Sequence, residues 1–244
     1  LYLIKLEENR YYLIWSQHHI LLDGWSGPLI INDLLNFYAQ VKRGHSINSS
    51  ERFSYKEYIS WLKNQDEIPL KEYWSEYLSG FEEPTWIRRK KEIVLKDDKR
   101  KEGKHSRRSE YEIYSFSLSS LMTDEVSTFA QRHRLTLNTV VQGVWSLLLK
   151  SYTQHEDVMF GTTLSGRSIP LPGVESGVGL FINTLPLRVQ FKGGETVLEL
   201  LNSLQERMIS ITEHGYASLA QIQAWQNNSE RETRRENSGE GINF

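Results

Sequence analysis

The sequence predicts a mixed α/β protein made of two lobes. Segments of strand length, rich in aromatic and aliphatic residues, alternate with segments whose apolar residues recur every three or four positions. This alternation stops over residues 88–109 and then resumes. With 244 residues, the chain is long enough for one large core or two smaller ones.

The first lobe is expected to begin with a β-hairpin and a helix. Residues 1–6 and 11–17 have the apolar and aromatic content of strands, with a polar turn between them. Ser26 and Pro28 are typical of a helix start, and the helix is expected to run to Gly44. Its apolar stripe consists of Ile30, Leu34, Tyr38 and Val41.

Two further helices are expected before residue 81. Ser54 and Glu57 have the spacing of a capping box, and the next helix is expected to begin at Pro69 and end at Gly80. The large apolar residues of these helices are interpreted as core: Tyr58, Trp61, Leu62, Tyr73, Trp74 and Tyr77.

Residues 88–109 are charged and lack apolar periodicity, which indicates a linker. A nucleic-acid patch is the alternative, but no aromatic residue interleaves with its bases, and acidic residues dilute them.

The second lobe is expected to contain a strand near 111–118, helices at 123–133 and 137–152, and a strand at 158–163. A loop over 165–179, one long buried strand over 178–191, a helix and a loose polar tail after residue 227 follow. The expected inward faces are Val140, Val141, Val144, Trp145 and Leu148 in one helix, and Leu198, Leu201, Leu204 and Met208 in the last.

Composition excludes several classes of protein. The formal net charge of -2 gives no field that would attract nucleic acid or an anionic membrane. The absence of cysteine excludes disulfides, thiolate metal sites and thiol nucleophiles. No apolar run has membrane length, so a cytoplasmic location is the default. The chain starts at Leu1 inside a strand-like run, and we interpret it as a fragment of a longer protein.

The residues His18, His19, Asp23 and Gly24 form the clearest candidate site. A neutral imidazole can accept a proton from an attacking nucleophile and return one to a leaving group, while Asp23 stays ionised. Adjacent residues of an extended segment point to opposite sides, so we expect His19 to face a cleft and His18 to bond locally. Asp23 is expected either to fix the loop by binding an arginine or to contact the substrate. Gly24 is expected to permit a backbone conformation or a close approach that a side chain would block.

Other interpretations of this pattern remain. A His-His pair at a strand end is commonly structural, and two histidines with a carboxylate can also bind zinc or iron. The remaining histidines show no repeated ligand spacing, so no metal site is predicted. A serine hydrolase is disfavoured because Ser165-Gly166 is not part of a nucleophile elbow.

Several segments together resemble the condensation domains of nonribosomal peptide synthetases. His18–Gly24 resembles the HHxxxDG active-site motif, and Tyr55–Trp61 resembles a Tyr-x-Asp-(Phe/Tyr) motif with Glu57 in place of the aspartate. Val178–Arg188 resembles the VGxFxNTxxxR motif, and Thr163–Arg167 resembles the loop that precedes it. Residues 216–222 resemble a weaker later motif.

The resemblance implies a chloramphenicol-acetyltransferase-like fold of two lobes, both incomplete here. Residues 1–87 would be the remainder of the N-terminal lobe, 88–109 the interlobe linker, and 110–244 the truncated C-terminal lobe. It also implies an acyltransferase of peptide antibiotic biosynthesis, inactive as an isolated fragment. In such enzymes the amine of a carrier-bound acceptor attacks the thioester of a carrier-bound donor.

The family's site residues are carried over by position. His19 takes the place of the catalytic histidine, as a base or as a group that orients the amine, and His18, Asp23 and Gly24 complete the motif. The expected residues of the substrate channel between the lobes are Trp25, Ser26, Arg167, Asn183 and Thr184. Asn183 and Thr184 are equally well explained by a strand end that satisfies its own polar groups.

The family's aspartate usually pairs with an arginine from an upstream motif that this chain lacks, so Asp23 is expected to lose that partner. Arg167 is the one substitute predicted. The implied partners are upstream and downstream peptidyl carrier domains and an adenylation domain. The phosphopantetheine belongs to the carriers, and no cofactor is expected on this domain.

Leu21, Leu22, Trp25 and residues 181–186 resemble the subtype that takes a donor ending in a D-residue. The two histidines count against the cyclisation relatives. An epimerisation domain and a noncatalytic carrier-docking module of the same fold are the alternatives.

Overall fold

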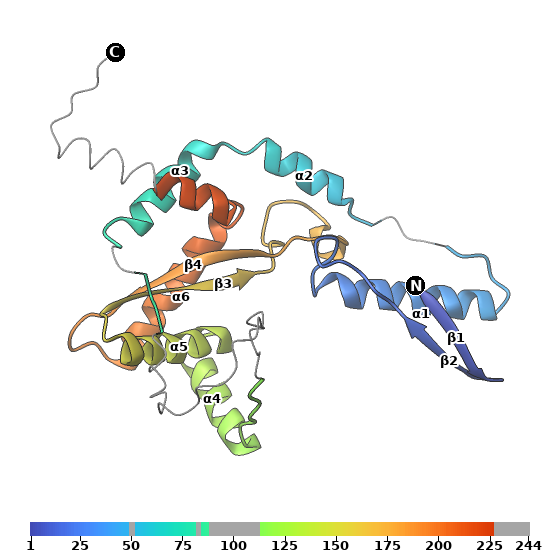
Figure 1. Ribbon diagram of the computed structural model, residues 1–244, viewed down its shortest axis with the longest axis horizontal. Helices are drawn as coiled ribbons and strands as arrows, with labels where there is room; N and C mark the ends of the chain where they lie inside the picture. Colours follow the sequence, from blue (N-terminus) through green and yellow to red (C-terminus); the bar gives the residue numbers. More distant parts are fainter. Residues whose placement is uncertain (49–51, 82–83, 88–112, 227–244) are drawn as a thin grey trace, which may run out of the picture. The chain divides into compact units, whose positions relative to one another are not determined.

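The computed structural model describes residues 1–48, 52–81, 84–87 and 113–226 (Figure 1). Helices and strands alternate along these ranges, which confirms the mixed α/β class. The described strands form two two-stranded sheets, β1-β2 and β3-β4. In these ranges no helix is both long enough and apolar enough to cross a membrane.

The predicted hairpin is present. Strand β1 (Tyr2–Glu7) pairs antiparallel with β2 (Arg10–Ile14), with Leu3 opposite Leu13 and an irregularity near Glu7. The second strand ends at Ile14, three residues earlier than predicted, so the two histidines do not lie on a strand.

Helix α1 (Ser26–Lys42) begins at the predicted serine and ends before Gly44, which takes a left-handed conformation with φ of 74°. Within its predicted apolar stripe, Ile30 is half-buried, whereas Leu34, Tyr38 and Val41 are exposed.

Helices α2 (Tyr55–Lys63) and α3 (Glu67–Leu78) follow as predicted, but α3 begins two residues before Pro69. Asp66 caps it by accepting a hydrogen bond from the Ile68 amide, a capping signal that the sequence prediction missed. The aromatic core is partly confirmed: Tyr58 and Trp74 are buried, and the other members are half-buried.

The predicted linker at 88–109 and the tail after residue 227 lie outside the described residues. The strand predicted near 111–118 is wrong over its described part, because residues 113–119 form no strand. The alternation there is short and interrupted at Tyr114 and Ser115, and none of the described strands pairs with it.

Helices α4 (Ser120–Arg132) and α5 (Leu137–Thr153) match the prediction, although α4 begins three residues earlier. The predicted inward face of α5 is wrong. Val140 is half-buried and the other four predicted residues are exposed, whereas the buried residues are Thr139, Gln142, Gly143, Ser146 and Leu149. A Cβ on Gly143 would lie 2.3 Å from Leu201 Cδ2, so helix α6 (Val197–Glu213) contacts the face of α5 that has the smallest side chains.

Strand β3 (Asp157–Leu164) and helix α6 (Val197–Glu213) are also confirmed. The long strand predicted over 178–191 is shorter: β4 runs only from Asn183 to Gln190. The preceding residues bond to the loop that carries the histidine motif, and they are therefore unavailable for sheet pairing.

The chain contacts divide the molecule into two compact units. One contains Leu1–Gly80, Gly161–Leu187 and Met208–Phe244, and the other contains Phe81–Phe160 and Arg188–Arg207. All contacts of the histidine motif described below lie within the first unit. The predicted lobe boundaries stay a prediction.

Candidate functional site

The motif histidines lie in a tight turn between β2 and α1. The Leu21 amide donates to the His18 carbonyl at 3.1 Å, which closes a four-residue turn. The Ile20 amide donates to Nδ1 of His18, also at 3.1 Å. His18 therefore makes the local hydrogen bond that was predicted for one of the pair.

His19 occupies the second position of this turn and is exposed. Its side chain makes no hydrogen bond or ion pair with any part of the chain that the structure describes. Its imidazole nitrogens are thus accessible to a ligand, as expected for the residue that meets a substrate. The catalytic assignment itself stays a prediction.

Asp23 anchors the turn. Its carboxylate is fully buried and accepts two hydrogen bonds from Arg167, at 2.7 and 3.1 Å. It also accepts from the Ser26 amide at 2.9 Å and the Phe181 amide at 3.0 Å. The Asp23 amide donates to the Gly179 carbonyl at 3.1 Å. Asp23 therefore joins its own loop to two distant segments of the chain, one at Arg167 and one at residues 179–181.

These contacts keep Asp23 ionised. Burial by itself would raise the pKa of the carboxyl, but the hydrogen bonds from Arg167, Ser26 and Phe181 together outweigh it and lower the pKa from 3.8 to about 2. A bidentate guanidinium–carboxylate pair with additional donors is the arrangement in which a buried charge pair is well compensated.

Arg167 is the predicted substitute partner of Asp23, and the structure confirms the pairing. Asp23 is therefore not left without an arginine, even though the upstream motif is missing. The guanidinium lies over the Phe181 ring at 4.2 Å and donates to the carbonyls of Gly177 and Ser165, each at 3.3 Å.

Gly166 allows Arg167 to take this position. Its φ of 69° lies in the left-handed region, and a Cβ there would lie 1.8 Å from the Phe181 carbonyl oxygen. Only glycine fits such a turn. Gly166 was not among the predicted site residues, although it directly precedes Arg167, which was.

The residues that follow the motif have internal roles. Ser26 Oγ lies 2.8 Å from Asp23 Oδ1 and 2.9 Å from the Gly179 carbonyl, and it accepts from the Gly179 amide. The indole of Trp25 donates to the Glu175 carbonyl at 3.0 Å, although half of the residue is exposed. Because Ser26 and Arg167 are buried, both stabilise the loop, and a substrate contact by either stays a prediction.

Of the two roles expected for Gly24, the special backbone conformation is not observed. Its φ is not positive, and a Cβ there would meet nothing within 4 Å. The fold therefore does not require glycine at this position, and the prediction that remains is close approach by a substrate.

Asn183 and Thr184 begin β4. The Asn183 amide group donates to the carbonyls of Gly215 and Ala217 at 2.8 and 2.6 Å, which gives it a structural role. Thr184 is exposed, with its hydroxyl 3.4 Å from that of Thr163. Of these two residues, Thr184 is the one whose side chain is accessible.

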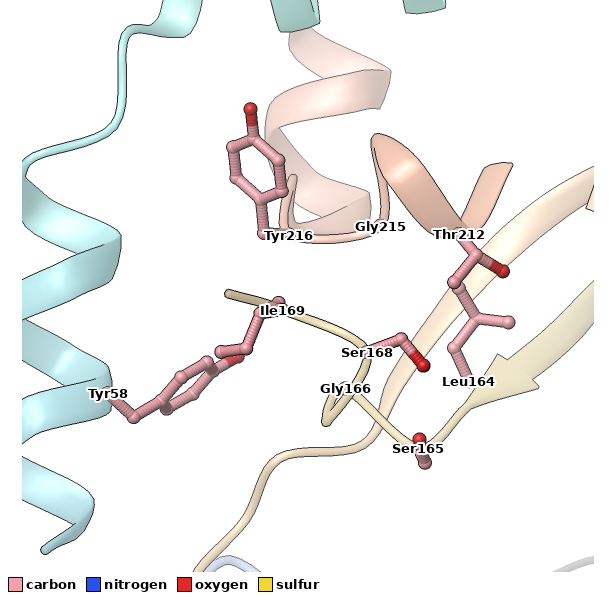
Figure 2. A pocket seen from close by; sticks show the side chains of 9 residues that line it. All are labelled: Tyr58, Leu164, Ser165, Gly166, Ser168, Ile169, Thr212, Gly215 and Tyr216. Carbon is pink, nitrogen blue, oxygen red and sulfur yellow. The ribbon is translucent and has the colours of Figure 1, made fainter. Parts of the chain in front are cut away.

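A cavity of about 90 Å³ lies next to the Gly166 turn (Figure 2). Tyr58, the loop after β3 and the end of α6 line it, and none of the residues His18–Gly24 does. In the described ranges, no three histidine or carboxylate side chains are grouped in a way that could hold a metal ion.

The sequence profile of the Condensation domain family matches residues 1–238. The chain therefore belongs to the condensation-domain family. It is similar to chondramide synthase of Chondromyces crocatus, with 39% identity over 91% of the chain and 5% of the relative. It is also similar to bacitracin synthase 1 of Bacillus licheniformis (36% identity, 91% of the chain, 4% of the relative) and to tyrocidine synthase 2 of Brevibacillus parabrevis (34%, 91% and 6%).

Solved structures confirm the fold. The first condensation domain of the calcium-dependent antibiotic synthetase, in complex with a substrate analogue, superposes with a TM-score of 0.65 at 19% identity. The match covers 82% of this chain and 42% of that chain. Condensation domains have the chloramphenicol-acetyltransferase-like fold, as predicted. The chain thus spans a small part of its synthetase relatives and under half of the solved domains that it matches.

Proposed function

We propose that this chain carries the centre of an amide-forming condensation domain of a nonribosomal peptide synthetase. The observation that supports this most directly is the accessible His19, held on a turn whose Asp23 is buried and bonded to Arg167. Such a turn offers a substrate an imidazole from a fixed position, which is how a protein lowers the entropic cost of a bimolecular reaction.

The proposed reaction joins two carrier-bound substrates. The amine nitrogen of the acceptor attacks the thioester carbonyl of the donor and forms a C–N bond. The tetrahedral intermediate then expels the donor carrier's thiolate as the C–S bond breaks. The proton lost by the amine and the proton gained by the thiolate balance, so no oxidant, reductant or metal is needed.

His19 is proposed to serve this step in one of two ways. It can accept the amine proton and pass it to the leaving thiolate, or it can orient the amine through a hydrogen bond. An α-amino group has a pKa near 8, so part of it is already deprotonated at neutral pH and strong base catalysis is not required. A pH profile of the His19→Ala variant distinguishes the two roles. If His19 acts only as a base, the rate lost in the variant should shrink as the pH rises above 8, whereas the loss should persist if His19 orients the amine.

The proposed partners are an upstream and a downstream peptidyl carrier domain, with an adenylation domain in the same synthetase. The phosphopantetheine arms on the carriers bring both thioesters to the site. The domain itself holds no cofactor in this proposal. The resemblance of Leu21, Leu22 and residues 181–186 to one subtype supports a donor that ends in a D-residue.

The test uses the synthetase module that contains this chain, with donor and acceptor loaded on its own carriers. Mass spectrometry of the released thioesters is expected to show the amide product, formed faster from a D-terminated donor than from its L-epimer. Inversion of the donor α-carbon without amide formation would assign an epimerisation domain instead. Carrier binding with neither product would assign a docking module.

A further inference from the structure

The motif at the start of α2 has a structural link to the catalytic turn. Tyr55 is the first residue of α2, and its hydroxyl donates to the Leu180 carbonyl at 2.8 Å. Leu180 lies in the segment 177–181 that precedes β4, which we call the strap. This hydrogen bond joins residues 125 positions apart in the sequence.

The ring of Tyr55 also fits closely against the strap. It meets the Phe181 ring edge-on, with 5.1 Å between the centroids and 87° between the planes. A Cβ at Gly179 would lie 2.3 Å from Tyr55 Cδ2. The close approach of ring and backbone therefore depends on glycine at this position.

The other side of the strap bonds to the loop that carries the histidines. The Phe181 amide donates to Asp23, and the Gly179 carbonyl accepts from the Asp23 amide. The Gly179 amide donates to Ser26 Oγ at 3.0 Å. The strap thus bonds to Tyr55 through Leu180, and to the loop that carries the histidines through Gly179 and Phe181.

Tyr55 is supported by a packed cluster. Tyr58, one turn further along α2, lies 4.8 Å from the Phe181 ring and belongs to a buried cluster with Val174 and Phe181. Burial and, to a lesser extent, the charge of Asp23 raise the pKa of Tyr55. The hydroxyl therefore remains protonated at neutral pH and can donate to the strap.

We propose that Tyr55 is a positioning residue for condensation: by holding the strap it fixes Asp23, and through Asp23 it sets the turn that presents His19. This role rests on the proposed function. Tyr55 acts through the strap and touches no substrate in this proposal.

The test compares single-turnover condensation rates of variants in the intact synthetase module, normalised to the folded fraction measured by circular dichroism. Tyr55→Phe keeps the ring and removes only the hydroxyl. It is expected to lower the rate about fivefold, as for the loss of one hydrogen bond, with little change in the acceptor concentration at half-maximal rate. Tyr58→Phe loses a hydroxyl from the same helix without changing the bond to Leu180, and it should retain the wild-type rate.

A double-mutant cycle tests whether Tyr55 acts on the turn through Asp23. In an Asp23→Asn background the effect of Tyr55→Phe should largely disappear, because the strap no longer holds an ionised carboxylate. Ser26→Ala is a second background if Asp23→Asn does not fold. If Tyr55→Phe lowers the rate by the same factor in both backgrounds as in the wild type, the proposal is overturned. A Tyr55→Phe variant that is less stable but condenses at the wild-type rate per folded molecule would also overturn it.

The two proposals fail separately. If His19→Ala retains the wild-type rate, the proposed function loses its catalytic residue, whatever Tyr55→Phe does. If His19→Ala abolishes product while Tyr55→Phe matches Tyr58→Phe, the function stands and only the positioning role is wrong.

Discussion

At the scale of single residues, Asp23 carries more contacts than the histidines beside it. Its buried carboxylate is held by a guanidinium, a hydroxyl and two amides. Removing one member of such a pair leaves an uncompensated buried charge, which typically costs about 3–5 kcal/mol. The stability of the turn therefore depends on Asp23, whereas the proposed chemistry depends on His19.

Acid should weaken this anchor in a defined window. The pKa of Asp23 in the folded protein, about 2, lies below its ordinary value of 3.8. The folded state therefore binds this proton less readily than the unfolded chain, and the stabilisation is complete above about pH 5 and lost as the pH falls through 2. We expect Asp23 to contribute about 2 kcal/mol to the pH dependence, measured by urea unfolding at a series of pH values.

Asp23→Asn is the matched control, because it has no titrating group at this position. The difference in unfolding free energy between wild type and variant should shrink as the pH is lowered towards 2. A difference of the same size at pH 5 and pH 2 would show that the carboxyl does not have the lowered pKa.

The sequence predicted some of these residues for good physical reasons. The spacing of His19 and Asp23 is local, and Arg167 was singled out as the one substitute for the arginine that usually pairs with this aspartate. The burial of Ser26 could not be predicted, because it depends on Gly179, 153 positions away.

At the scale of elements, the main differences between prediction and structure have physical causes. The apolar run at 178–191 predicts one strand, but its first part bonds to the Asp23 loop and only Asn183–Gln190 forms β4. Periodicity reports which residues are apolar, not where their backbone groups find partners. The start signals at Ser26 and Ser54 are local, so the helix starts next to them were predicted to within one residue, although the Ser54 side chain makes no capping hydrogen bond.

In helix α5, too, apolar periodicity did not determine the packing. Its apolar residues predicted the buried face, yet the face against α6 contains Thr139 and Gly143, since Thr139 Oγ1 lies 3.3 Å from Gln205 Oε1 and Gly143 allows close contact. Partner choice between helices is a tertiary property, and one helical stripe does not specify it.

The Gly166 turn is the element whose conformation is most restricted. Gly166→Ala places a Cβ against the Phe181 carbonyl in a left-handed backbone, so the turn must rearrange and Arg167 must leave Asp23. We expect a loss of at least about 2 kcal/mol in unfolding free energy, measured by chemical denaturation.

Gly27→Ala is the matched control for this glycine substitution. A Cβ at Gly27 meets nothing within 4 Å, and the residue lies in the first turn of α1 without a positive φ. Its stability should stay equal to wild type or rise slightly. Equal stability of the two variants would mean that the turn is not constrained as described.

At the scale of the whole molecule, the chain matches only a part of each of its relatives. It covers 3–6% of the synthetases and 42–44% of the condensation-domain structures described by its first matches. Apolar side chains are also exposed on single helices of the chain. On α5, Val141, Val144 and Trp145 are all exposed. Apolar area of this kind promotes association in water.

Substitution on that face should reveal this association. Residues 1–244 expressed alone are expected to self-associate in light scattering, and Val144→Lys, at a position 62% exposed, should reduce association without loss of helicity. Leu149→Lys, at a position 3% exposed, should instead unfold the helix packing. A monomeric wild-type chain that Val144→Lys leaves unchanged would contradict the exposure of this face.

In the proposed reaction, His19 meets the reacting groups while Asp23 holds its turn. The most direct measurement is the single-turnover rate of amide formation by the intact synthetase module carrying His19→Ala, compared with His45→Ala, an exposed histidine outside the motif. We expect a fall of about a hundredfold or more for His19→Ala at neutral pH, with the wild-type rate for His45→Ala. Wild-type rates for both variants, at an unchanged folded fraction, would contradict it.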